Sequence, residues 1–158
     1  VDLEQLQFIS DFLALPLGKI VGVFLFFFMG GYLFYGALFA AIGSAVDSET
    51  DTQQFMLPMT MPLIFSIAVS FSIVVGDPNG TLATWMSIIP FTSPVTMMVR
   101  LPFMGEELSW QIYLSMAIML MSIVAAIVVA GKIYRTGILM YGKKASYKEL
   151  AKWLFYKN

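Results

Sequence analysis

The chain of 158 residues contains no cysteine and no histidine. Disulfides, thiol chemistry and zinc sites built on these side chains are therefore excluded, and so is a nucleophile paired with a histidine base. Charged residues are also scarce, at 12 %, about half of the share usual in water-soluble domains. Hydrophobic residues make up 59 % of the chain, and its mean hydropathy is +0.81. This composition predicts a membrane protein whose surroundings are the lipid bilayer.

Three long segments without a charged side chain are predicted to cross the membrane. Residues 20–46 form 27 uncharged positions, which as a helix would rise about 40 Å against a hydrocarbon core of roughly 30 Å. Residues 55–75 and 112–131 are the second and third segments, and each matches the roughly 17–25 residues that a spanning helix needs. The predicted transmembrane domain covers residues 19–131.

Residues 81–100, between the second and third spans, predict a short re-entrant helical hairpin that ends at Arg100. Pro90 and Pro94 interrupt its apolar part, and each proline removes a backbone donor and disfavours a single straight helix. Two short helices that enter the membrane and return are the better interpretation. Because irregular backbone at membrane depth must be covered by protein or water, we expect this hairpin to pack on other helices.

The basic tail, residues 132–158, determines the predicted orientation. It holds seven Lys or Arg residues and one acid, whereas residues 76–111 hold a single base. The positive-inside rule then places the tail and the C-terminus in the cytoplasm, and it places the pre-membrane segment 1–18 outside. Ser146 and Glu149 have the spacing of a capping box, which predicts an amphipathic tail helix at the membrane surface.

An acidic cluster, Asp47, Glu49 and Asp51 with Ser48 among them, follows the first span. One interpretation is a turn that caps the next helix, with Asp51 or Thr52 as the N-cap. The other is a contact loop for a cytoplasmic partner, because a short connection between two spans is accessible for docking. We expect no metal site, since the cluster lacks the glycine and the distal glutamate of a calcium loop.

Small residues recur at helical spacing in the first span, at Gly36, Ala40, Gly43 and Ser44. Residues of this kind four positions apart allow helix backbones to approach closely in lipid, which predicts a helix-packing face. The alternative is that glycine is simply common in membrane helices. Both interpretations leave this face without a catalytic role.

Two prolines, Pro58 and Pro62, lie in the second span. Prolines inside a helix bend it, so the pair is a candidate hinge that transmits motion from the acidic loop. Alternatively, Pro58 lies in the first turn of a helix that begins near Phe55, where its missing N–H costs nothing.

Motifs that would supply energy or catalysis are absent from this sequence. It contains no G-x-x-x-x-G-K-[ST] phosphate-binding loop, so it is not an ATPase by that route. The three predicted spans contain no Asp, Glu, Lys, Arg or His, which makes a proton relay or an intramembrane enzyme improbable. We expect no catalytic residue and no cofactor in this chain.

Three blocks occur in order along the chain: GYLFYGALFAAIGSAVDSETDTQQFMLPMTMPL, SIIPFTSPVTMMVRLP and GKIYRTGILMYGKKASYKELAKWL. Together they resemble the C-terminal half of a type-2 ABC exporter permease, most closely the group of sodium-extruding permeases. The resemblance implies six spanning helices per subunit, of which this chain supplies the last three. It also implies two permease units, identical or homologous, that associate with two cytoplasmic ATP-binding subunits. Since Val1 is not an initiator methionine, we expect the chain to be either a piece of a longer polypeptide or a processed product.

The predicted fold is therefore an all-α integral membrane protein with three transmembrane helices, a re-entrant hairpin and a cytoplasmic tail helix. The predicted function is that of a multi-pass permease subunit in the cell membrane, exporting sodium ions or a small amphiphile while a separate subunit hydrolyses ATP. The alternative is a non-transporting scaffold that binds partner proteins or anionic lipid. A nucleic acid is not an expected partner.

Overall fold

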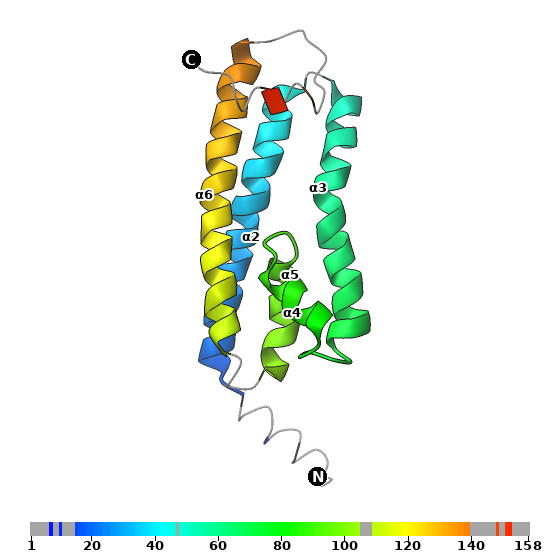
Figure 1. The fold of residues 1–158 in the computed structure, drawn as a ribbon, viewed down its shortest axis with the longest axis vertical. Helices are drawn as coiled ribbons and strands as arrows, with labels where there is room; N and C mark the ends of the chain where they lie inside the picture. The colour runs from blue at the N-terminus through cyan, green and yellow to red at the C-terminus, as the bar shows by residue number, and fades with distance from the viewer. Residues whose placement is uncertain are drawn as a thin grey trace.

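The computed structural model of the chain describes residues 7, 10, 15–46, 48–104, 109–139, 148 and 151–152. Every element in this described part is helical, and Figure 1 shows three long helices running side by side with two short ones at one end. In chain order the elements are α2 (Leu17–Ala45), α3 (Glu49–Val69), the π-helix η1 (Ser70–Val74), α4 (Thr81–Ile88), α5 (Ser93–Arg100), the 3₁₀-helix η2 (Leu101–Phe103) and α6 (Ser109–Leu139).

Three of these helices are long and apolar enough to cross a membrane: Leu17–Ala45, Glu49–Ser72 and Ser109–Thr136. The predicted all-α membrane fold with three spanning helices is therefore confirmed. All three helices begin before the uncharged segments that predicted them. The first begins three residues earlier than expected, and α6 continues past Lys132 to Leu139.

The second spanning helix, α3, begins at Glu49, six residues before the predicted start of that span. Ser48 is its N-cap, and the Ser48 side chain accepts a hydrogen bond of 3.1 Å from the backbone N–H of Asp51. Glu49 and Asp51 lie in the first turn, where negative charge is favourable at the positive end of the helix dipole. The predicted span began too late because it was defined by uncharged residues alone, and the first turn of this helix is acidic.

The principal core lies between α2, α6 and the two short helices. Phe27 of α2, Met97 of α5 and Met119 of α6 are completely buried in it. A second, smaller cluster joins the far ends of α2 and α6 through Ala41, Ala45 and Ile133. Helices α2 and α6 therefore pack along most of their length, whereas α3 stands farther from α6 (Figure 1).

The outer surface of the bundle is strongly apolar. Only 33 %, 22 % and 28 % of the residues in the most hydrophobic stretches of the three spans are buried inside the protein. Large side chains such as Phe28, Phe65 and Met121 are 59 %, 60 % and 64 % exposed. In water such a surface would drive aggregation, but in a bilayer it faces lipid chains, and the helices satisfy their own backbone groups.

The three long helices alternate in direction, so the two ends of the bundle differ in content. The connection between α2 and α3 and the end of α6 lie at one end, whereas the short helices and the starts of α2 and α6 lie at the other (Figure 1). The predicted tail helix after Ser146 lies mostly outside the described residues. Lys148, Ala151 and Lys152, which are described, are helical.

Candidate functional site

The hairpin formed by α4 and α5 is surrounded by buried polar side chains. They come from both helices of the hairpin, from the turn between them and from the faces of α3, η1 and α6 next to it. The buried members are Ser66, Ser70, Ser87, Thr92, Ser93, Thr96, Arg100, Gln111 and Ser115. Except for Arg100 they are neutral, so this buried polar cluster is built mainly from hydroxyl groups.

Arg100, the last residue of α5, is completely buried. Its Nη1 donates a hydrogen bond of 2.9 Å to the Ser87 hydroxyl, and its Nη2 donates one of 3.1 Å to the Thr84 hydroxyl. Its Nε donates to the backbone carbonyl of Pro78, in the loop before α4. The planar guanidinium suits this task because it presents its donors in a fixed fork. It thereby ties the loop, α4 and α5 together through neutral oxygens.

The cluster continues from the hairpin to α6. The Ser115 hydroxyl donates a hydrogen bond of 2.6 Å to the backbone carbonyl of Ser87, whose own hydroxyl accepts from Arg100. Gln111 lies one turn before Ser115 on α6, is 6 % exposed, and its Oε1 has no partner within the described residues. A buried acceptor without a donor is costly, so Gln111 is the weak point of an otherwise satisfied cluster.

The turn of the hairpin is fixed by contacts with α2 and by its own hydroxyl. The Thr92 hydroxyl donates a hydrogen bond of 2.6 Å to the Met86 carbonyl, which closes the turn. The Tyr35 hydroxyl, from α2, donates one of 2.6 Å to the Phe91 carbonyl. The Phe34 and Phe91 rings also meet edge to face, with centroids 5.0 Å apart. The turn between α4 and α5 is thus held in place by side chains of α2 and by the Thr92 hydroxyl.

The two hairpin prolines lie where a helix tolerates them. Pro90 is in the turn between α4 and α5, and Pro94 is in the first turn of α5, where its missing N–H has no intrahelical partner to lose. The predicted division of this segment into two short helices is confirmed. Its entry into the membrane stays a prediction.

The predicted contact loop is only partly a loop. Glu49 and Asp51 belong to the first turn of α3, Ser48 caps it, and Asp47 lies outside the described residues. The prediction of Asp51 or Thr52 as N-cap is wrong. Ser48 takes this position because its extended backbone (φ −110°, ψ 142°) directs its hydroxyl at the Asp51 N–H. Ser48, Glu49 and Asp51 are exposed or half-exposed at the end of the bundle, so they remain accessible to a partner.

Pro58 and Pro62 both lie in the interior of α3. The interpretation that Pro58 eases the start of a helix near Phe55 is wrong, because the helix begins at Glu49. Each proline leaves the carbonyl four residues earlier without its backbone donor, which weakens the helix locally. The hinge stays a prediction.

The predicted packing face of the first span is exposed within this chain. Gly36, Ala40 and Gly43 are exposed, and a β-carbon placed on either glycine would meet no heavy atom of the described chain within 4 Å. Ser44 bonds back to its own helix, at the Ala41 carbonyl. The nearby groove between α2 and α6 is open and apolar, with a volume of about 320 Å³, and Ala40 is among the residues that line it. A packing role for this face thus requires a helix beyond the described ones.

Two other glycines of α2 make the close contacts. A β-carbon on Gly31 would lie 3.0 Å from the Cβ of Pro94, and one on Gly30 would lie 3.4 Å from the Cγ of Met119. Sequence reasoning did not identify Gly30 and Gly31 as contact residues, because spacing alone does not identify the face that meets the hairpin. The packing role of Gly36, Ala40, Gly43 and Ser44 stays a prediction. Sequence reasoning also missed the hydroxyl residues around Arg100, although Thr84, Ser87 and the other hydroxyls of this segment were visible as an unusually polar stretch in an apolar chain.

A profile of the family described as ABC-2 family transporter protein matches residues 6–132 of the chain. The chain belongs to this family. The match covers all of α2, α3 and the hairpin and most of α6. The resemblance to a type-2 ABC permease is thereby confirmed, and the chain is assigned to a membrane component of ABC transport.

Two relatives of the chain are described as uncharacterized proteins. One is the uncharacterized protein YhaP of Bacillus subtilis, 32 % identical over 124 residues, which are 78 % of this chain and 29 % of the relative. The other is the uncharacterized protein MJ1024 of Methanocaldococcus jannaschii, 32 % identical over 133 residues, which are 84 % of this chain and 32 % of the relative. The chain thus spans about a third of the length of these relatives. No solved structure matches it.

Proposed function

We propose that the chain is the membrane-spanning C-terminal part of the permease of an ATP-driven ABC exporter, with ATP hydrolysis on a separate subunit. The observation that carries this proposal is the match of the ABC-2 family over residues 6–132, the part that contains the three spanning helices. A second permease copy or homologue would complete the translocation path. The cargo is proposed to be sodium ions or a small amphiphile.

The charges of the described residues support an external energy source. Among the described residues the buried charged side chain is Arg100. Its Nε, Nη1 and Nη2 donate hydrogen bonds to Pro78, Ser87 and Thr84. Arginine stays protonated at any physiological pH, so this group is unsuited to carrying protons. Movement of cargo would therefore depend on work done elsewhere, as in a transporter with separate ATP-binding subunits.

The two ends of the bundle support an orientation with the C-terminus in the cytoplasm. Lys132 and Arg135, near the end of α6, are exposed, and the acidic residues at the start of α3 lie at the same end (Figure 1). By the positive-inside rule this end faces the cytoplasm, where an ATP-binding subunit would dock. Ser48, Glu49 and Asp51 are then placed to contact that subunit, and Pro58 lies nine residues into the same helix.

The first experiment tests the ATP-binding partner. The full-length protein is purified from its host together with any bound subunits, and transport is measured in proteoliposomes as ATP-dependent movement of ²²Na⁺ or of a fluorescent amphiphile. Co-purification of an ATP-binding subunit and ATP-dependent transport of one of the two cargoes are expected. A lone permease with no nucleotide-dependent transport would refute the exporter and favour the scaffold.

A matched pair of variants tests the contact loop in the same preparation. The double variant Glu49→Gln with Asp51→Asn removes the charges at the start of α3, and Asp77→Asn removes an exposed acid at the opposite end of the bundle. Loss of the ATP-binding subunit is expected only from the first variant. Equal retention by both would exclude the loop as the contact.

Orientation is tested separately, because the chain has no native cysteine. In intact cells an impermeant maleimide should label Asn79→Cys, in the loop before α4, and should not label Lys143→Cys in the tail. Labelling of Lys143→Cys without labelling of Asn79→Cys would reverse the proposed orientation.

A further inference from the structure

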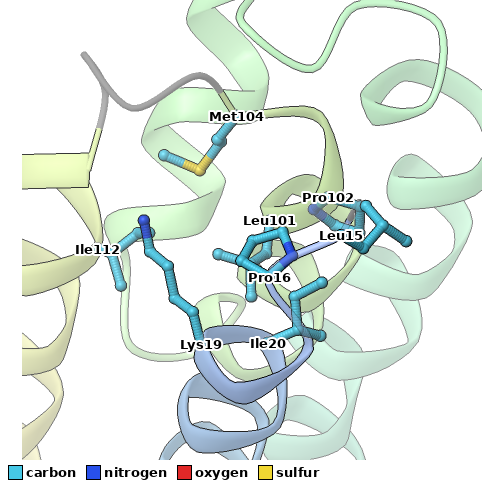
Figure 2. A pocket seen from close by; sticks show the side chains of 8 residues that line it. All are labelled: Leu15, Pro16, Lys19, Ile20, Leu101, Pro102, Met104 and Ile112. Atoms are coloured by element: carbon cyan, nitrogen blue, oxygen red, sulfur yellow. The ribbon is translucent and has the colours of Figure 1, made fainter. Parts of the chain in front are cut away.

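A cleft of about 120 Å³ lies at the end of the bundle where α2 and α6 begin. Its walls come from the start of α2, from η2 just after the hairpin, and from the first turns of α6 (Figure 2). The residues that line it are Leu15, Pro16, Lys19, Ile20, Leu101, Pro102, Met104 and Ile112. This volume holds several water-sized groups and is too small for a helix or a folded segment.

The cleft combines apolar walls with one cation. Of the described residues that line it, only Lys19 is charged, and its side chain is exposed. The Lys19 ammonium donates a hydrogen bond of 2.9 Å to the Ser109 hydroxyl, at the start of α6. An ammonium has three N–H donors, so this bond leaves two for a ligand. The described first turns of α2 and α6 contain no acidic residue that would compete for them.

The position of the cleft along the bundle corresponds to the ends of two candidate membrane spans, Leu17–Ala45 and Ser109–Thr136. Beside it, Trp110 is 59 % exposed and Phe103 is 51 % exposed. Aromatic side chains of this kind are enriched where hydrocarbon meets the headgroups, and lysines near helix ends extend to the same level. The occupant of the cleft must therefore be compatible with both apolar walls and a cationic opening.

We propose that this cleft binds the headgroup end of a bilayer phospholipid. The phosphate accepts hydrogen bonds from the Lys19 ammonium and from the Ser109 hydroxyl, and the glycerol and first methylene groups lie against the apolar walls formed by Ile20, Leu101 and Ile112. A phosphodiester linked to hydrocarbon matches the single positive charge and the apolar lining together, which a free anion does not. In the orientation proposed above this lipid belongs to the outer leaflet. The site depends on membrane insertion, and not on the transport activity.

The test measures phospholipid binding by the intact full-length protein in detergent, titrated with phosphatidylglycerol and followed by native mass spectrometry. Lys19→Met is expected to weaken binding about tenfold, the effect of losing a charge-assisted hydrogen bond. Lys19→Arg should retain affinity to within about threefold, because it keeps the charge and the donors. The matched control Lys132→Met removes one exposed lysine at the opposite end and should leave the affinity unchanged. Size-exclusion profiles identify any variant that fails to fold, and Lys19→Gln, which also removes the charge, then takes the place of Lys19→Met in the comparison.

Three results would overturn the proposal. Equal loss from Lys19→Met and Lys132→Met would mean that the lipid responds only to net charge. Inorganic phosphate binding as tightly as the phospholipid would identify an anion site without a role for the apolar walls. Stronger lipid binding by the double variant Glu106→Gln with Glu107→Gln, by tenfold or more, would mean that these carboxylates, which precede Ser109 in the sequence, compete with the lipid for Lys19. Because transport is not measured, failure here leaves the exporter proposal intact, and loss of transport leaves the lipid site intact.

Discussion

Replacing Gly31 by alanine is expected to weaken the packing of the hairpin against α2. A β-carbon at this position would lie 3.0 Å from the Cβ and 3.2 Å from the Cγ of Pro94. Ordinary carbon contacts are at about 3.5–4.0 Å, so several tenths of an ångström must be absorbed. The proline ring is bonded to its own backbone nitrogen, and a change of ring pucker moves Cγ but hardly moves Cβ, so α2 and α5 must separate to relieve the contact.

The magnitude follows from comparison with Gly36→Ala, five residues along the same helix. A β-carbon at Gly36 would meet no heavy atom of the described chain within 4 Å. Both substitutions gain the higher helix propensity of alanine, about 1 kcal/mol in water, and this term cancels in the difference. Overpacking in a well-packed interior costs about 1–3 kcal/mol. Gly31→Ala should therefore be less stable than Gly36→Ala by about 1–3 kcal/mol.

The assay is equilibrium unfolding of the full chain in mixed micelles with increasing sodium dodecyl sulfate. With Trp110→Phe and Trp153→Phe in every variant, the fluorescence of the remaining tryptophan, Trp85 on α4, reports on the hairpin, and circular dichroism reports on the helices. A Gly31→Ala midpoint equal to or above that of Gly36→Ala would refute the reasoning, because it would mean that Pro94 does not press on α2. If the Trp85 fluorescence of Gly31→Ala changes at a lower sodium dodecyl sulfate concentration than the circular dichroism, the weakening lies in the hairpin.

Three further predictions follow from the buried cluster and the start of α3. Arg100→Lys should destabilise the hairpin by about 2 kcal/mol or more, since a single ammonium cannot reproduce hydrogen bonds to three separated oxygens. Hydrogen–deuterium exchange followed by mass spectrometry should then show faster exchange of the α4 amides. Gln111→Leu should be neutral or stabilising in the same unfolding assay, because it removes a buried acceptor that has no partner in the described structure; a large loss of stability would reveal a partner. Ser48→Ala should cost about 1 kcal/mol through loss of the N-cap to Asp51, and Ser48→Asp should restore it. Unchanged stability in Ser48→Ala would contradict that cap.

The predicted positions of the spanning helices needed no tertiary information. Long uncharged segments leave few alternatives in lipid, since each backbone N–H and C=O must be satisfied within the segment. The hairpin break was also visible, because Pro90 and Pro94 act locally on the backbone. Helix starts were less visible: Ser48 lies in a polar stretch, and hydropathy does not register a capping hydrogen bond.

Contacts between distant parts of the chain were beyond the sequence pattern. Gly31 and Gly36 are the same residue type in the same helix, yet one meets Pro94 and the other faces outward. The difference arises from the rotation of α2 about its axis, which depends on the helices packed around it. Arg100 is a comparable case: the sequence placed it at the end of the predicted hairpin, but only the structure shows that it is buried and bonded to Thr84 and Ser87.

Composition and the spacing of prolines were thus sufficient for the membrane class, the three spans and the division of the hairpin, because these follow from the solvent and from local backbone geometry. Packing of the helices against one another decided the rest. It determines which glycines are in contact, and it buries a guanidinium with no carboxylate beside it in the described structure. It also brings Lys19 to Ser109, 90 residues away in the sequence. These properties belong to pairs of residues far apart along the chain, and such pairs exist only once the helices have packed.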